Sequence, residues 1–321
     1  MIRLITMTTL SLATTSVAGD ILLIPPIDCD LTQTCYIQQT VDHDPGPGAQ
    51  DFQCGSLSYD GHEGTDFALP TLAMQAAGVD VFAAASGTVR GVCDDMADIL
   101  QGSPGAPDVS SRECGNGIVV SHGDGWETQY CHLKQGSVTV QTGQIVTTGQ
   151  VLGQVGLSGA TQFPHVHLSV RKDGDVVDPF APDAPNVCGE TSEKALWTAD
   201  VPFPAGGLIV AGFSDAVPNY ASIKAGTAGQ TGMAKTAPAL VVWGLAFGGR
   251  SGDRMTLTIR GPKGVVFQDT QILERTQAQL FRAGGKRTPP GGWPAGDYTG
   301  TIELRRGDDL LDVLGTQVTL N

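Results

Sequence analysis

Short runs of apolar and β-branched residues recur along the chain between turns marked by glycine or proline. Clear runs lie at 117–122 (GIVVSH), 127–133 (ETQYCHL) and 165–168 (HVHL). Such runs are too short for most helices, and their turn-residue boundaries are typical of strands. The glycine content, 43 residues in 321, agrees with tight turns between strands. The sequence therefore predicts an all-β protein.

A second series of strands follows residues 179–194, a segment with proline, acidic residues and Cys188. The spacing of these strands is typical of a β-sandwich. No histidine, cysteine or paired-carboxylate cluster occurs among them, so we expect an immunoglobulin-like β-sandwich accessory domain with no chemistry of its own. The predicted strands are 208–210, 239–243, 255–259, 265–267, 298–304 and 318–320.

Residues 1–18 combine a positive Arg3, an apolar run at 4–12 and small residues at 16–18, the pattern of a secretory signal peptide. An ordinary N-terminal strand or helix is the alternative. No later run approaches the ~18 apolar residues that span a bilayer. We expect an exported protein, periplasmic or extracellular, without a membrane span. Its predicted segments are a signal peptide (1–18), a disulfide-stapled lead-in (19–60), a domain with the motifs described below (61–180), a linker (181–200) and the accessory domain (201–321).

Charge narrows the class of partners. The net charge is −14, whereas binding to phosphate backbones needs clustered Lys and Arg, so a nucleic-acid partner is excluded. Charged residues make up only 16% of the chain, and hydrophobic residues make up 40%, enough for substantial cores.

Seven cysteines without any CxxC spacing indicate disulfides in an oxidising compartment, with an odd one left over. Cys93 and Cys114 flank a polar insertion between strands that we expect to be neighbours. We predict a Cys93–Cys114 disulfide, which would close a loop of about 20 residues and contribute about 3 kcal/mol in the chain-entropy model.

Two short motifs carry the candidate chemistry. The first, 61–67 (GHEGTDF), offers His62 and Asp66, and the second is the HVHL run. On a strand, residues i and i+2 point to the same face, so His165 and His167 can converge while Val166 faces the core. His62, Asp66 and one of that pair would form a three-ligand zinc site with an open position for water, as in catalytic centres.

The motifs, in this order, resemble those of the M23 (lysostaphin/LytM-type) zinc metallopeptidases over about residues 61–179. The matching stretches are 62–66 (HEGTD), 130–133 (YCHL) and 165–167 (HVH), with glycine-rich turns at 143–144 and 149–150. The resemblance implies an antiparallel β catalytic domain that cleaves peptide bonds in bacterial peptidoglycan, in the cross-bridge or the stem peptides. It also implies that His62, Asp66 and His167 bind Zn²⁺ and that His132 and His165 are non-ligand catalytic histidines.

The sequence departs from the family pattern at residues 71–80, at the insertion between Cys93 and Cys114, and at residues 162–164. All three departures are expected around the groove, so they bear on substrate preference rather than on the metal ligands. The alternatives are a non-catalytic LytM-like activator or binding module for another wall hydrolase, a secreted peptidase acting on proteins, and a purely structural secreted β protein. The partner of the accessory domain and the oligomeric state stay open.

No HExxH glutamate is present, so an imidazole must serve as the base, and either His132 or His165 can do so. Glu63 is expected to point away from the ligands, and His122 to be structural. Strand alternation places Tyr130 and His132 on one face. Residues 42–44 (DHD) predict a solvated turn. A further hypothesis is that they approach the zinc and that the lead-in restrains activity.

Overall fold

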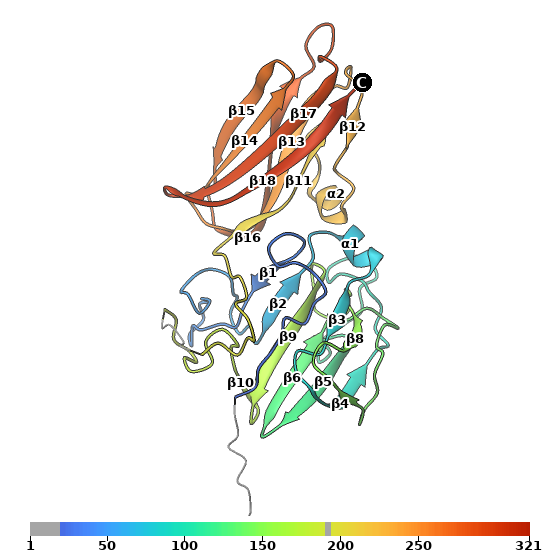
Figure 1. Cartoon of the computed structure of the whole chain (residues 1–321), viewed down its shortest axis with the longest axis vertical. Coiled ribbons are helices and arrows are strands. Elements are labelled where there is room, and N and C mark those ends of the chain that lie inside the picture. Colours follow the sequence, from blue (N-terminus) through green and yellow to red (C-terminus); the bar gives the residue numbers. More distant parts are fainter. Residues whose placement is uncertain (1–19, 190–193) are drawn as a thin grey trace, which may run out of the picture.

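The computed structural model describes residues 20–189 and 194–321 (Figure 1). The predicted signal peptide lies outside these residues. Strands dominate, and the predicted all-β fold is confirmed. Two short helices, α1 (Leu72–Ala77) and α2 (Tyr220–Ala225), were not predicted from the sequence. Each begins at a side chain that caps it, since Thr71 accepts from the Met74 amide and Asn219 accepts from the Ser222 amide. No described helix has the length and apolar character needed to cross a membrane.

The N-terminal region, comprising the described residues up to 200, contains an antiparallel eight-stranded sheet. Its strand order is β1-β2-β9-β6-β5-β4-β7, and β10 pairs with β9. A two-stranded sheet, β3 with β8, shares one hydrophobic core with it through residues such as Phe67, Val81, Leu152 and Val166. The bounds are β1 (Tyr36–Gln39), β2 (Thr65–Ala68), β3 (Asp80–Phe82), β4 (Gly87–Cys93), β5 (Gly117–Gly123), β6 (Trp126–Cys131), β7 (Ile145–Val146), β8 (Val151–Gln154), β9 (His165–Lys172) and β10 (Asp175–Val176).

The C-terminal region, residues 201–321, consists of two sheets around a second core. A three-stranded sheet has the order β11-β13-β16, and a five-stranded sheet has the order β12-β18-β17-β14-β15. Phe213 and Val242 of the first sheet pack in one cluster with Leu257 and Ile302 of the second. The immunoglobulin-like assignment stays a prediction. The bounds are β11 (Gly207–Ser214), β12 (Gly232–Met233), β13 (Ala239–Gly249), β14 (Arg254–Gly261), β15 (Gly264–Ile272), β16 (Gln277–Arg287), β17 (Gly296–Arg306) and β18 (Asp309–Leu320).

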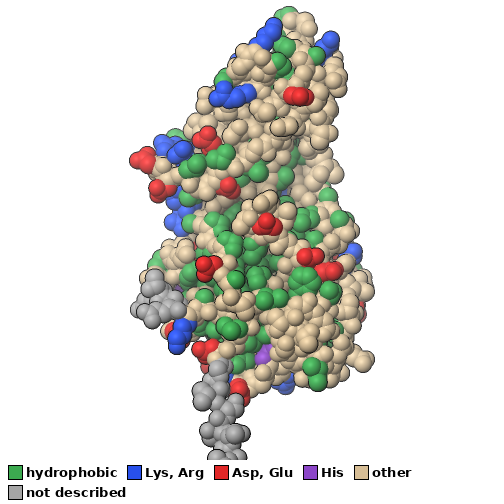
Figure 2. Space-filling view, in the orientation of Figure 1, with side chains coloured by type: hydrophobic (Ala, Val, Ile, Leu, Met, Phe, Trp, Pro, Cys, Tyr) green, Lys and Arg blue, Asp and Glu red, His purple; other side chains and the backbone are tan. Residues whose placement is uncertain are grey.

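A third apolar cluster joins the two regions. Tyr36 and Leu57 pack there with Ile223, Trp243 and Phe247 of the C-terminal region. The rings of Tyr36 and Phe247 lie 4.7 Å apart between centroids. In the space-filling view, apolar side chains gather on the visible face where the regions meet (Figure 2). This interface, which we call the joining cluster, holds the C-terminal region against the N-terminal one.

The predicted linker and lead-in are integrated into the N-terminal region. Leu196 and Trp197 are buried in its core, and Trp197 forms a β-bridge with Leu23 of the lead-in. A disulfide joins Cys54 to Cys188. The lead-in also supplies β1, an edge strand of the main sheet, and contains the Cys29–Cys35 disulfide. Within the predicted linker at 181–200, Leu196 and Trp197 therefore pack against the N-terminal region.

The predicted Cys93–Cys114 disulfide is wrong. Cys114 is bonded to Cys131, and Cys93 is free and exposed. Strand β5 lies between β4 and β6, and the chain preceding β5 folds toward the β6 side, where the His132 amide donates to the Cys114 carbonyl at 2.8 Å. The sequence shows that Cys93 and Cys114 flank an insertion, but not which neighbour of β5 the second cysteine faces.

Candidate metal centre

The register of β2 against β9 creates the centre. Asp66 lies directly opposite His167 in this antiparallel pair, so their side chains project from the same face of the sheet. His62 comes from the turn that precedes β2. Its Nε2 atom lies 3.2 Å from both Asp66 Oδ1 and His167 Nδ1, and the last two atoms are 2.8 Å apart. Two imidazoles and one carboxylate therefore converge on one point.

The other nitrogen of each imidazole has a partner. His62 Nδ1 donates to the Thr40 carbonyl at 2.7 Å, which directs the Nε2 lone pair toward Asp66 and His167. His167 Nε2 lies 3.0 Å from the Ser169 hydroxyl. Such outer contacts orient metal-binding histidines and fix their tautomers. Thr40 belongs to the lead-in, so this segment helps to position the first candidate ligand.

The donor set fits a divalent transition metal. Ligand atoms at 2.0–2.1 Å in tetrahedral geometry lie roughly 3.3 Å from one another, close to the observed separations. The backbone leaves no room for a side chain beside them. A Cβ atom on Gly64 would lie 2.5 Å from His167 Nε2 and 2.6 Å from the Leu168 carbonyl oxygen. Glycine between His62 and Asp66 is therefore a steric requirement of the centre.

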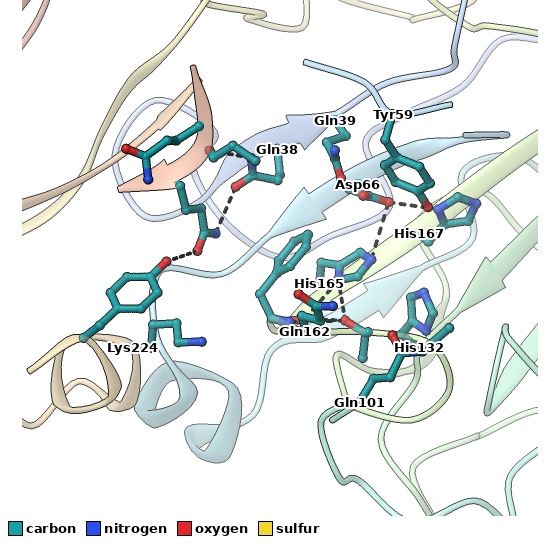
Figure 3. Close-up of a pocket in the computed structure, with 17 residues that line it drawn as sticks. Gln38, Gln39, Tyr59, Asp66, Gln101, His132, Gln162, His165, His167 and Lys224 are labelled. Carbon is teal, nitrogen blue, oxygen red and sulfur yellow. Dashed lines mark hydrogen bonds and ion pairs between the residues drawn. The ribbon is translucent and has the colours of Figure 1, made fainter. Parts of the chain in front are cut away.

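Two further histidines, His132 and His165, lie beside Asp66 and His167 (Figure 3). His165 shares a face of β9 with His167, and its Nε2 lies 3.4 Å from Asp66 Oδ1. The His132 ring centroid lies 4.6 Å from that of His165 and 6.1 Å from that of His167. His132 Nδ1 donates to the Ser158 carbonyl at 2.8 Å. The structure thus brings together all five residues that the sequence analysis singled out.

The position of His132 beside the centre depends on its backbone conformation and does not follow from strand alternation. Strand β6 ends at Cys131, and His132 has a left-handed φ of 63°. Tyr130 is buried in the N-terminal core, where its hydroxyl accepts from the Ala84 amide at 2.7 Å. The predicted shared face of Tyr130 and His132 is wrong, because the left-handed residue turns its imidazole toward the metal centre.

Burial and mutual attraction set the charges of the cluster. Burial acts to raise the pKa of Asp66, but the adjacent His62 and His165 outweigh it and hold that pKa well below its usual value. Burial acts to lower the pKa of His62, but Asp66 outweighs it and leaves the value raised. Burial, together with the neighbouring His165 and His167, holds the pKa of His132 well below its usual value. The centre therefore combines an ionised carboxylate with a neutral His132.

A cavity of about 680 Å³ opens beside the cluster. Gln38, Gln39 and Tyr59 precede β2 and form one part of its wall, and Gln101, Gln162 and Phe163 form another. The C-terminal region contributes Tyr220, Lys224, Gln277, Ala278 and Gln279. None of these C-terminal residues was singled out from the sequence, because no spacing or residue type distinguishes them before the two regions are placed together.

The remaining polar candidates lie away from the cluster. His43 is buried, with Nε2 2.8 Å from Asp178 Oδ2 and Nδ1 2.9 Å from the Val187 carbonyl oxygen, so the predicted solvated turn is wrong at this residue. Asp42 accepts from the amides of Asp44, Gln50 and Gly61. Neither side chain is directed at the metal centre, so Asp42 and His43 do not approach the candidate zinc ligands. Restraint of activity by the rest of the lead-in stays a hypothesis.

Glu63 and His122 behave as expected from the sequence. The Glu63 side chain is exposed and lies 3.7 Å from Arg171. His122 lies 2.8 Å from both the Ser86 carbonyl oxygen and the Thr128 hydroxyl. These partners lie outside the cluster of donors, so neither residue belongs to the metal centre.

Residues 60–179 match the sequence model of "Peptidase family M23". The cell division protein DipM of Caulobacter vibrioides is 39% identical over 71 residues, which are 22% of this chain and 11% of that protein. The peptidoglycan DD-endopeptidase ShyB of Vibrio cholerae is 30% identical over 124 residues, 39% of this chain and 24% of that protein. The chain thus matches only a minor part of these curated relatives. A zinc-containing peptidase from Vibrio cholerae aligns in structure with 24% identity and a TM-score of 0.35, over 52% of this chain and 41% of that one.

Proposed function

Because residues 60–179 belong to peptidase family M23, we propose that this protein is an exported zinc metalloendopeptidase that hydrolyses peptide bonds in bacterial peptidoglycan. The observation that carries the proposal is the His62–Asp66–His167 cluster, with two more histidines beside it and a cavity above it. The name of the ShyB relative supports the substrate class. The three disulfides support an oxidising compartment outside the cytoplasm.

His62, Asp66 and His167 would hold the metal, and the N/N/O set leaves a coordination position for water, as catalytic zinc requires. When bound, zinc lowers the pKa of a water ligand to about 7 and polarises a carbonyl group. The Thr40 carbonyl and the Ser169 hydroxyl keep the two imidazoles in the orientation that donation needs. Gly64 leaves the space that this arrangement occupies.

His132 and His165 would do the proton chemistry. The Nδ1 atom of His132 faces the Ser158 carbonyl, and that of His165 faces the Phe163 carbonyl at 3.0 Å. A carbonyl can only accept, so Nδ1 carries the proton in both rings and Nε2 is left toward the cluster. We propose that one imidazole accepts the proton of the attacking water and that the other stabilises the oxyanion of the intermediate.

Metal content and activity of single variants test these assignments. We expect about one zinc per chain in the wild type, loss of zinc in His167→Ala, and retained zinc with lost activity in His132→Ala and His165→Ala. His122→Ala is a matched control and should keep both properties. If His165→Ala emptied the site while His167→Ala kept its metal, the ligand assignment would be wrong. The variant whose residual activity lacks the acidic limb of the pH–rate profile identifies the base.

Incubation with purified peptidoglycan tests the reaction. We expect release of new amino groups without new reducing sugars, abolished by a chelator and restored by zinc. Casein should be cleaved poorly, because the cavity is walled on several sides. Cleavage of casein with an untouched wall would instead identify a general peptidase. Bound zinc with no cleavage of either substrate would support a LytM-like binding module.

A further inference from the structure

The C-terminal region forms a fixed wall of the cavity that contains the metal centre. Gln279 of β16 donates from Nε2 to Gln38 Oε1 and to the Tyr36 hydroxyl, both at 2.9 Å. The Tyr220 hydroxyl of α2 donates to Gln279 Oε1 at 3.1 Å. Gln38 Nε2 in turn donates to the Ala278 carbonyl at 3.1 Å. These bonds lock the edge of β16 to the lead-in beside the cluster.

Helix α2 is held as firmly as β16. Ile223 is fully buried in the joining cluster. A Cβ atom on Gly226, which ends the helix, would lie 3.0 Å from both Ala73 Cβ and Thr71 Oγ1 at α1. Residue 224 therefore has a fixed place on the wall rather than a place on a free surface.

Lys224 brings positive charge into the cavity. It is the only Lys or Arg that lines the cavity among the described residues. Its side chain extends from α2 into the cavity (Figure 3). Its Nζ lies 4.9 Å from the centroid of the Tyr220 ring, and no carboxylate of the described chain forms an ion pair with it. A cation over an aromatic ring is positioned but keeps its charge and its hydrogen-bonding capacity for a ligand.

The positive charge continues beyond the cavity. A depression of about 650 Å³ adjoins it, sharing Tyr220, Gln277 and Gln279, and adds Arg275 and Arg282. Glu274 is the one acidic residue lining this depression within the described chain, and the Asp66 of the cavity belongs to the metal centre. The whole protein carries 33 acidic and 19 basic residues. The grouping of Lys224, Arg275 and Arg282 along these adjoining hollows is therefore opposite in sign to the net charge of the protein.

From this geometry we propose that the C-terminal wall is a carboxylate-binding subsite, in which Lys224 binds a free carboxylate of the peptide whose scissile bond lies at the metal centre. The inference rests on the proposed peptidase function and narrows its substrate. The substrate would be a stem peptide with free carboxylates rather than a neutral cross-bridge. Amide side chains around the cavity (Gln39, Gln101, Gln162 and Gln277) supply donors and acceptors for the peptide backbone.

Equilibrium binding tests the subsite without turnover. The probe is a purified soluble stem peptide from peptidoglycan, used with free carboxylates and in a fully amidated form. Titration calorimetry is done on the zinc-loaded full-length chain in a His132→Ala background. We expect Lys224→Met to weaken binding of the free form about 10-fold, as loss of a charge-assisted hydrogen bond implies, and to leave the amidated form unchanged.

Two further variants make the test specific. Lys224→Arg keeps the charge and should bind the free form within about threefold of the Lys224 protein. Lys263→Met removes an exposed lysine on the β14–β15 turn and should change nothing. Lys224→Gln replaces Lys224→Met if thermal unfolding shows that the apolar side chain destabilises the fold.

Equal weakening for both peptide forms would show that Lys224 acts through packing, and it would overturn the proposal. So would unchanged binding in Lys224→Met, or no binding of the free form to the Lys224 protein. A separate experiment tests the peptidase function. If the zinc-loaded wild type leaves peptidoglycan intact, the proposed peptidase function is wrong. In that event a charge-dependent loss of binding would still support the carboxylate subsite.

Discussion

The two regions of the molecule contribute to one cavity by different means. The N-terminal region holds all six histidines and all seven cysteines, and its strands are short, with only four residues in β1 and four in β2. The C-terminal region has neither residue type, and its strands run to 12 residues in β18. The first region supplies the candidate metal ligands, two of them through strand register, and the second supplies a wall through amides and one lysine.

The two regions are stabilised in different ways. Long paired strands give the C-terminal region a continuous hydrogen-bonded framework and one core. The N-terminal region has irregular segments at both of its ends, and it ties them down with disulfides and with the joining cluster. The candidate metal ligands thus lie in a region that is stabilised by disulfides and by packing against the C-terminal region.

The largest expected effect distinguishes the cross-links. Cys54–Cys188 spans 134 residues and Cys29–Cys35 spans six, so the chain-entropy model gives about 5 and about 2 kcal/mol of stability respectively. We expect the double variant Cys54→Ser/Cys188→Ser to lose more free energy of unfolding than Cys29→Ser/Cys35→Ser in urea titrations. Equal losses would mean that local packing, rather than loop closure, determines the contribution of these bonds.

Breaking the joining cluster should destabilise the protein next most. Phe247 is buried against Tyr36, and Phe247→Ala is expected to cost about 4 kcal/mol, as other large-to-small changes in cores do. Val265→Ala on the exposed β15 is the control and should cost under about 1 kcal/mol. Unfolding monitored for both regions should show both destabilised by Phe247→Ala. A shift confined to the C-terminal region would show that the two regions unfold independently.

A smaller change should disable the metal centre while the fold survives. Gly64→Ala places a Cβ atom against His167 and the Leu168 carbonyl, and we expect about 100-fold weaker zinc affinity. Gly91→Ala is the matched control, because no atom lies within 4 Å of the Cβ it would add. Competition with a chromophoric chelator measures both affinities. Unchanged affinity in Gly64→Ala would contradict the steric requirement.

The smallest effect concerns pH. Burial acts to lower the pKa of His43, but the hydrogen bond and charge of Asp178 outweigh it, so the pKa is raised. Both partners of the imidazole accept, which favours the doubly protonated ring. A raised pKa in the folded state means that stability is fully present below the ordinary value near 6.5 and is lost as pH rises through the raised value.

We therefore expect the wild type to lose on the order of 1 kcal/mol of unfolding free energy from pH 6 to pH 8 relative to His43→Asn. Asp178→Asn removes the carboxylate that raises the pKa, so it should flatten the pH dependence as well. Denaturant titrations at several pH values measure the slopes. Identical slopes in the wild type and both variants would show that His43 does not titrate in this range.

The proximity of the candidate site residues could be predicted from the sequence because it depends on local geometry and motif order. Strand periodicity alone places His165 and His167 on one face, and motif order adds His62, Asp66 and His132. The path of His132 could not be predicted, because it depends on a left-handed φ that nothing in its neighbours requires.

The contribution of the C-terminal region was not predictable for other physical reasons. Strand β16 was missed because residues 277–287 mix polar residues, apolar residues and glycines without clear alternation. Helix α2 has only six residues and owes its place to the Asn219 cap and to the burial of Ile223. Nothing in the sequence around Lys224 indicates that it lines the cavity. Its position there depends on the packing of the C-terminal region against the N-terminal region.

The separation of the candidate ligands also has a consequence for synthesis of the chain. Asp66 and His167 are 101 residues apart, so the centre cannot form until β9 has been made and has paired with β2. At roughly 5–20 residues per second, a ribosome needs about 5–20 s to get from one ligand to the other. Throughout that interval the growing polypeptide has only part of its ligand set. The candidate centre is therefore incomplete during translation and can form only after the long loop between the two strands has closed.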